Sequence, residues 1–118
     1  MAVTKIKAIR STLDKAVKYI CNPEKTKGML LVDSFGCVPE FAAQQMEATA
    51  RKNKRGGCRK AYHLMQSFAP EDNITPEKAL EIGRQFADGV TRGKHQYVIA
   101  VHTDRDHIHC HIIFNAVD

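Results

Sequence analysis

The stretch "HQYVIAVHTDRDHIHCHIIFN" (residues 95–115) places four of the chain's six histidines within ten positions, from residue 102 to residue 111. The pattern of apolar residues over 95–102 and 107–115 predicts two strands joined by a short acidic turn. Because successive side chains of a strand point to opposite faces, the second strand has a polar face on the open side of the sheet and an apolar face against helices. The polar face carries His107, His109, His111, Ile113 and Asn115, and the apolar face carries Ile108, Cys110, Ile112 and Phe114.

The histidines of this hairpin predict a metal site. If His102 pairs with His109, then His111 is its diagonal neighbour on the same face, and three imidazoles converge. Three neutral nitrogen ligands suit a divalent transition metal and leave open coordination positions, as catalytic sites require. The expected cofactor is a divalent metal ion, namely Mg²⁺, Mn²⁺ or Zn²⁺. Asp104 is assigned to the catalytic site as the acceptor of a ligand's outer N–H, and His107 to a phosphate contact or an outer hydrogen bond. The alternative is a set of histidines that lie on the surface of an exposed hairpin and bind no metal.

The rest of the chain predicts a single α+β domain over residues 1–118, with helices packed on one face of a largely antiparallel sheet of about five strands. Thr75 is predicted to cap a helix that has Pro76 at its first position. The start of the chain holds no continuous apolar segment, which predicts a cytoplasmic protein that does not engage a membrane. Strands at 3–9, 28–35 and 61–68, helices at 11–21, 39–53 and 75–89, and the final two strands give the order βαβαβαββ.

A basic segment, "RKNKRGGCRK" (51–60), carries six of the eighteen basic residues and no acid in a chain of net charge +5. Its two glycines predict a flexible loop, and its charge indicates a polyanionic partner such as DNA. A solvated loop without a partner is the alternative. The basic residues assigned to DNA are Arg51, Lys52, Lys54, Arg55, Arg59 and Lys60.

The four cysteines form no CxxC pair, which indicates reduced thiols.

One tyrosine lies on the polar side of its predicted helix. Leu13, Ala16, Val17 and Ile20 form an apolar stripe at helical spacing, and Tyr19 lies roughly 120° from the centre of that stripe, so its hydroxyl can reach a substrate. An exposed surface tyrosine without a role is the alternative. The other two tyrosines, Tyr62 and Tyr97, alternate onto apolar strand faces and are predicted to lie in the core.

Three segments resemble, in order, the motifs of mobilization relaxases, which are members of the His-hydrophobic-His endonuclease superfamily. These are "AVKYICNPEKT" (16–26), "YHLMQSF" (62–68) and "HTDRDHIHCHIIFN" (102–115). The resemblance implies a relaxase-like fold with Tyr19 as the nucleophile, a metal at the three histidines, and Ser67 in contact with DNA near the cut. His63 shares the face of Ser67 and is assigned to DNA with it.

The same resemblance implies site- and strand-specific nicking of single-stranded DNA at a transfer origin, through a 5′-phosphotyrosyl intermediate, together with accessory mobilization proteins. Relaxases usually continue beyond their histidine strand, so residues 1–118 are expected to be the N-terminal fragment of a longer protein. Two alternatives stay open. One is a rolling-circle replication initiator or transposase of the same superfamily, and the other is a non-catalytic, metal-containing module that binds single strands. The HxE and PCxxC motifs of zinc deaminases and the HExxH motif of metallopeptidases are absent from the sequence.

Overall fold

The computed structural model describes residues 2–52, 60–103 and 107–117. The order of elements confirms the predicted βαβαβαββ arrangement, with two short 3₁₀ turns, Pro39–Phe41 and Pro70–Asp72, before the second and third helices. The strands are β1 (Ala2–Ile9), β2 (Val32–Phe35), β3 (Ala61–Phe68), β4 (Tyr97–His102) and β5 (Ile108–Asn115), and the helices are α1 (Leu13–Ile20), α2 (Ala42–Lys52) and α3 (Pro76–Thr91).

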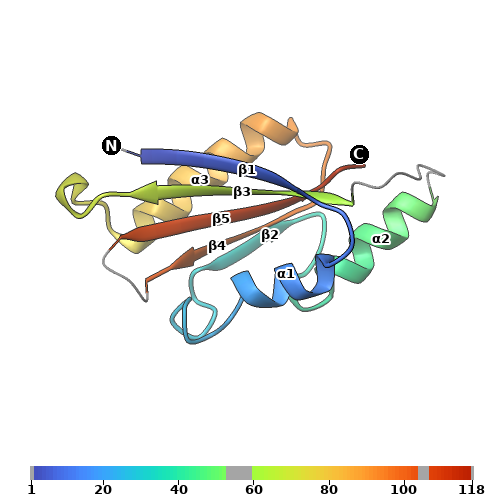
Figure 1. Cartoon of the computed structure of the whole chain (residues 1–118), viewed down its shortest axis with the longest axis horizontal. Coiled ribbons are helices and arrows are strands. Elements are labelled where there is room, and N and C mark those ends of the chain that lie inside the picture. Colours follow the sequence, from blue (N-terminus) through green and yellow to red (C-terminus); the bar gives the residue numbers. More distant parts are fainter. Residues whose placement is uncertain (1, 53–59, 104–106, 118) are drawn as a thin grey trace.

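The five strands form one sheet in the order β1-β3-β5-β4-β2, and every neighbouring pair is antiparallel (Figure 1). This confirms the predicted α+β class and antiparallel sheet. The middle strand is β5, the last of the five along the chain, while β1 and β2 lie at the two edges. The histidine strand therefore has a hydrogen-bonded neighbour on each side, β3 and β4.

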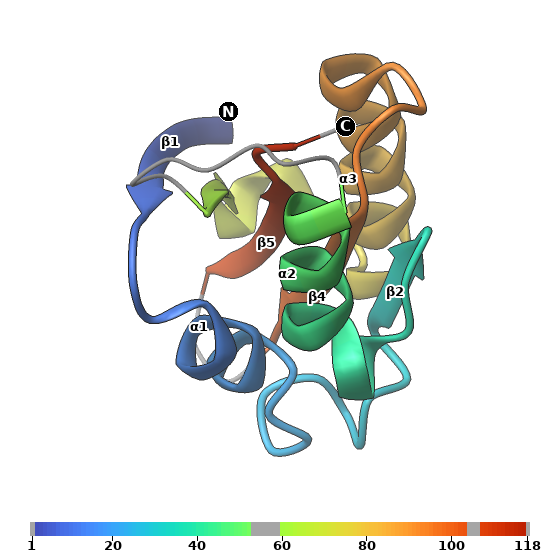
Figure 2. The ribbon, with the colours of Figure 1, turned by 90° about the vertical axis from the view of Figure 1, so that its right-hand side faces the viewer.

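Helices cover both faces of the sheet, which corrects the prediction of helices on one face (Figure 2). On one face, Val98, Ala100 and Ile113 pack in a cluster with residues of α1 and α2. On the other face, alternate residues of the same strands, Val101 and Ile112 among them, pack in a cluster with residues of α3. The physical reason is that β4 is buried along its whole length, and a strand that is apolar on both faces needs a layer on each.

Two local features show how the sequence shapes these elements. The amide of Lys78 donates to the Thr75 hydroxyl at 3.1 Å, which confirms the predicted cap of α3. The strand predicted at 28–35 begins only at Val32, because Lys27, Gly28 and Met29 adopt positive φ angles that a strand excludes. Within the described ranges, none of the helices combines the length and the apolar character needed to cross a bilayer.

Candidate active site

The register of the last two strands brings the predicted metal ligands onto one face. His102 pairs directly with His109, as predicted, and Ala100 pairs with His111. The ring centres of His102 and His111 are 4.2 Å apart, and those of His109 and His111 are 6.2 Å apart. On the other side of β5, Ser67 pairs with His109, so this predicted DNA contact neighbours a predicted ligand.

The histidine face is not open to solvent at its centre, which corrects the prediction that it lies on the open side of the sheet. His102 is 3% exposed and His111 is 4% exposed, because the end of α1 covers them. The Nε2 atom of His102 lies 2.8 Å from the carbonyl oxygen of Ile20, the last residue of α1. A carbonyl oxygen only accepts, so Nε2 of His102 carries a proton.

His63 on β3 joins this cluster through a contact that the sequence pattern did not indicate. Its Nε2 atom lies 2.9 Å from Nδ1 of His111. Burial, together with the charges of Lys7 and His102, lowers the pKa of His63 to about 4. Burial and neighbouring positive groups lower the pKa of His111 to about 3, so both rings are neutral at pH 7 and one of them donates to the other.

The other ring nitrogen of His111, Nε2, is relevant to whether this residue can bind a metal ion. Its Nε2 atom is buried and has no hydrogen-bond partner in the described part of the chain. If Nδ1–H donates to His63, Nε2 presents an unused lone pair, and a ligand histidine supported in this way suits a divalent cation. Within residues 2–52, 60–103 and 107–117, however, no three side chains of His, Cys, Asp or Glu are already grouped as a complete metal site. The donor types fit the ion, and the three-histidine site stays a prediction.

Tyr19 lies beside the buried histidines and also reaches the surface. Its ring centre is 5.7 Å from that of His102 and 6.3 Å from that of His111, and both contacts are edge-on. The side chain is 52% exposed, in agreement with its place away from the apolar stripe of α1. The other two tyrosines lie on the α3 side of the sheet: Tyr97 belongs to the core there, and Tyr62 stacks on Phe114, which packs against that core.

An open pocket of about 410 Å³ adjoins these residues. Two lysines of the edge strand β1, Lys5 and Lys7, line it together with Tyr19, His63 and His111. These lysines were not predicted as site residues, although the alternation in "VTKIKAI" (3–9) places them on one face of their strand. The pocket thus combines exposed positive charge, a tyrosine and imidazoles, which are groups that can hold a phosphodiester.

The remaining predicted residues are distributed around this centre. Arg51 and Lys52 are exposed in the last turn of α2, and Lys60 is exposed with its ammonium 3.1 Å from the Glu47 carboxylate. His107 is exposed and precedes β5, which corrects its predicted place within the strand. Four predicted site residues, Lys54, Arg55, Arg59 and Asp104, lie outside the described residues.

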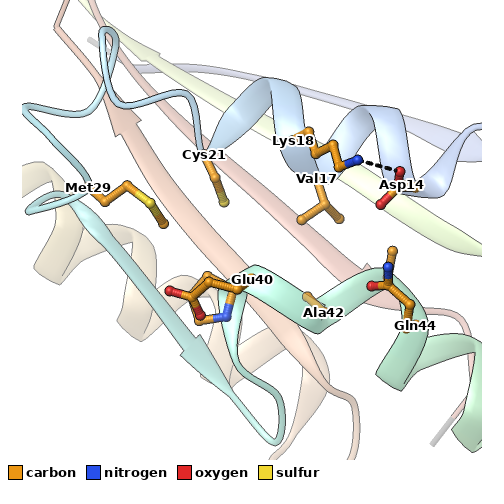
Figure 3. A pocket seen from close by; sticks show the side chains of 10 residues that line it. Asp14, Val17, Lys18, Cys21, Met29, Glu40, Ala42 and Gln44 are labelled. Atoms are coloured by element: carbon orange, nitrogen blue, oxygen red, sulfur yellow. Dashed lines mark ion pairs between the residues drawn. The ribbon is translucent and has the colours of Figure 1, made fainter.

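A second pocket, of about 170 Å³, lies between α1 and the start of α2 (Figure 3). Asp14 and Lys18 of α1 line it and form an ion pair at 3.1 Å. Cys21 also lines it, and burial is the main cause that raises the pKa of this thiol to about 11, so the sulfur is a poor nucleophile near neutral pH. The lining includes none of the residues predicted to hold metal or DNA, so this pocket is separate from the candidate site.

Comparisons with known proteins identify the family to which this sequence is similar. The family model described as "Relaxase: MobA/VirD2-like, nuclease domain" matches residues 19–118. The group II intron-interrupted relaxase LtrB of Lactococcus lactis subsp. cremoris is 36% identical over 85% of this chain and 22% of its own length. Protein rlx of Staphylococcus aureus is 30% identical over the whole chain and 33% of its own length, and protein TraI of Escherichia coli is 33% identical over 92% of the chain and 15% of its own length.

The chain thus spans about a third or less of the length of these relatives. The matched region includes Tyr19, both buried histidines and all of β5. The match covers well over half of the chain, and several relatives are at least 30% identical over nearly all of it. The chain therefore belongs to the relaxase family, as a nuclease domain of the MobA/VirD2-like type.

Proposed function

We propose that this domain nicks single-stranded DNA at a transfer origin by transesterification, with Tyr19 as the nucleophile. The observation that carries the proposal is the position of Tyr19: its ring contacts His102 and His111, while the other two tyrosines lie on the opposite face of the sheet. Membership of the relaxase family supports DNA as the substrate and favours a relaxase over a replication initiator or a transposase.

The proposed reaction exchanges one phosphate ester for another. The phenol oxygen of Tyr19 loses its proton and forms a bond to phosphorus, while the bond from phosphorus to the 3′ oxygen breaks and that oxygen gains a proton. The products are a 5′-phosphotyrosyl link and a free 3′ hydroxyl, so the energy of the ester is kept and the strand can later be rejoined. The exposed side of Tyr19 lets its hydroxyl meet a strand that arrives from solvent.

His102, His109 and His111 are proposed to hold a divalent ion, which would withdraw charge from the scissile phosphate. The unpartnered Nε2 atom of His111 supports this assignment, since a buried polar nitrogen without a partner is otherwise costly. His63 keeps the His111 ring oriented through the 2.9 Å contact between the two imidazoles. Asp104 is retained as a proposed acceptor for a ligand N–H.

The pocket beside Tyr19 is the proposed path of the DNA backbone. Lys5 and Lys7 line it and can pair with phosphates on either side of the cut. Ser67 and His63 lie on the same face of β3 and would contact the strand close to the metal. Proposed outer contacts to DNA are Arg51, Lys52, Lys54, Arg55, Arg59, Lys60 and His107, and accessory mobilization proteins are proposed as further partners.

The experiment that tests the reaction removes one oxygen atom. The Tyr19→Phe variant should keep its fold, its metal binding and its DNA binding, and should lose the metal-dependent, SDS-resistant adduct with a single-stranded origin oligonucleotide. Tyr62→Phe is the matched control, because it removes the same atom on the other face of the sheet, and it should form the adduct. An adduct with Tyr19→Phe, or a nucleotide mapped by mass spectrometry to another residue, would show that the assignment is wrong.

The metal is tested separately by calorimetric titration with Mn²⁺. The variant with alanine at all three proposed ligands should lose binding, and His109→Ala alone should weaken it. The single variant is included because the triple variant could misfold: His102 and His111 are fully buried, whereas His109 is only half-buried. Parental affinity in the folded His109→Ala variant would place the ion elsewhere.

Equal DNA binding by the parent and by Tyr19→Phe, with no adduct from either, would favour the non-catalytic binding module.

A further inference from the structure

The turn after α1 is fixed by its own hydrogen bonds. The carbonyl oxygen of Asn22 accepts from the amides of Lys25 and Thr26, at 3.0 and 3.2 Å, and from the Thr26 hydroxyl at 2.9 Å. The same hydroxyl accepts from the amide of Met29 at 3.2 Å, and Thr26 is completely buried. The turn is therefore a defined structure, and it holds Lys25 at a defined place.

Lys25 contacts two of the segments that form the candidate active site. Its carbonyl oxygen accepts from the amide of Thr103 at 2.9 Å, which ties the turn to the residue after His102. Its ammonium nitrogen lies over the ring of Tyr19, 5.5 Å from the ring centre, within the range of a cation–π contact. Its charge also contributes to the lowered pKa of His111. The ammonium of Lys25 therefore lies over the ring of Tyr19 and close enough to His111 to lower the pKa of that imidazole.

The side chain of an exposed nucleophile needs contacts that restrict its rotamers. With 52% of its surface exposed, Tyr19 would otherwise sample several rotamers. In-line attack requires the reacting atoms to approach within about 3–3.5 Å in a defined orientation, so each additional rotamer lowers the reactive fraction. The imidazoles of His102 and His111 meet the ring at 73° and 84°, and Lys25 lies over its face.

We propose that Lys25 is a positioning residue for the nucleophile, because its ammonium holds the Tyr19 ring against His102 and His111 through a cation–π contact. The hydrogen bond from the Thr103 amide to the Lys25 carbonyl oxygen holds the turn against the end of β4. This inference rests on the proposed role of Tyr19 and adds the residue that orders it before DNA arrives.

The test compares three variants. Lys25→Met removes the charge and keeps a flexible, unbranched side chain, whereas Lys25→Arg keeps a cation that can stack on the ring. Lys27→Met is the matched control, because it removes one charge from the same turn at a residue whose ammonium lies 3.9 Å from the Glu77 carboxylate.

The first measurement uses the protein alone. Nuclear Overhauser contacts between the Tyr19 ring and the imidazoles of His102 and His111 should weaken in Lys25→Met. They should persist in Lys25→Arg and in Lys27→Met. Undiminished contacts in Lys25→Met would overturn the proposal, whether or not the domain nicks DNA.

The second measurement separates positioning from DNA binding. At saturating single-stranded oligonucleotide, the single-turnover rate of adduct formation should fall about two- to fivefold in Lys25→Met, the effect of losing one exposed cation–π contact. Its Kd for DNA should equal that of Lys27→Met, and Lys25→Arg should restore the rate. Weaker DNA binding at an undiminished rate would overturn positioning in favour of a DNA contact. If the parent forms no adduct, the proposed function fails, and the contacts of Tyr19 in the protein alone still decide the role of Lys25.

Discussion

Replacing Lys5 and Lys7 by glutamine tests whether the pocket beside Tyr19 is the path of the DNA backbone. The register of β1 and β3 pairs Lys7 with His63 and Lys5 with Met65, so both lysines flank the same part of the sheet. Each phosphate contact with a single strand contributes roughly 0.7 to the slope of log affinity against log salt. Losing two contacts should flatten the slope by roughly 1.4, so between about 50 and 200 mM salt the parent should lose about seven times more affinity than the variant.

Fluorescence anisotropy with a labelled single-stranded oligonucleotide at several salt concentrations measures this slope. The control replaces Lys78 and Lys94 by glutamine, which removes the same charge from α3 and from the segment after it. Because α3 covers the other face of the sheet, the control should keep the parental slope. Equal slopes for the two double variants would refute the reasoning, since the lysines of β1 would then act only through the net charge of the domain.

Gly83→Ala should destabilise the domain by about 1–3 kcal/mol, because a Cβ atom at this position of α3 would lie 2.6 Å from Cδ1 of Ile99; an unchanged Tm would contradict this close packing. His63→Ala should weaken Mn²⁺ binding about 10- to 100-fold, because His63 orients His111; calorimetry that finds parental affinity would remove that role. Burial raises the pKa of Cys37 from 9.0 to about 11, so at pH 8 its alkylation should be about a hundredfold slower than that of an ordinary thiol and should accelerate as pH rises; labelling at the ordinary rate would contradict this.

The pairing of His102 with His109 could be predicted because it depends on local rules. A short turn between two strands fixes their register, and the alternation of side chains then decides which histidines share a face. The position of Tyr19 followed from helical periodicity in the same way. Both predictions concern residues that lie close together in the sequence or on one element.

The errors concern contacts between distant segments. The polarity of the histidine face indicated solvent, but α1 buries His102 and His111, and no local pattern states which helix packs on which strand. The continuous apolar run from Tyr97 to Val101 did carry a signal for helices on both faces. The contact between His63 and His111 depends on β3 lying beside β5, a neighbour relation that the order of strands along the chain does not reveal.

The central position of β5 has a consequence for how the domain is made. A chain is synthesised from its N-terminus, so β1, β3, β4 and helix α1, which carries Tyr19, leave the ribosome before the strand that joins the two halves of the sheet. Until residues 108–115 emerge, β3 and β4 have no common neighbour, and two of the three proposed ligands do not yet exist. A nascent or prematurely terminated chain would therefore carry Tyr19 without two of the histidines that are proposed to act with it. On the proposed mechanism, cutting of DNA requires that translation of the domain is finished, which would separate the synthesis of this nuclease domain from its action on the cell's own strands.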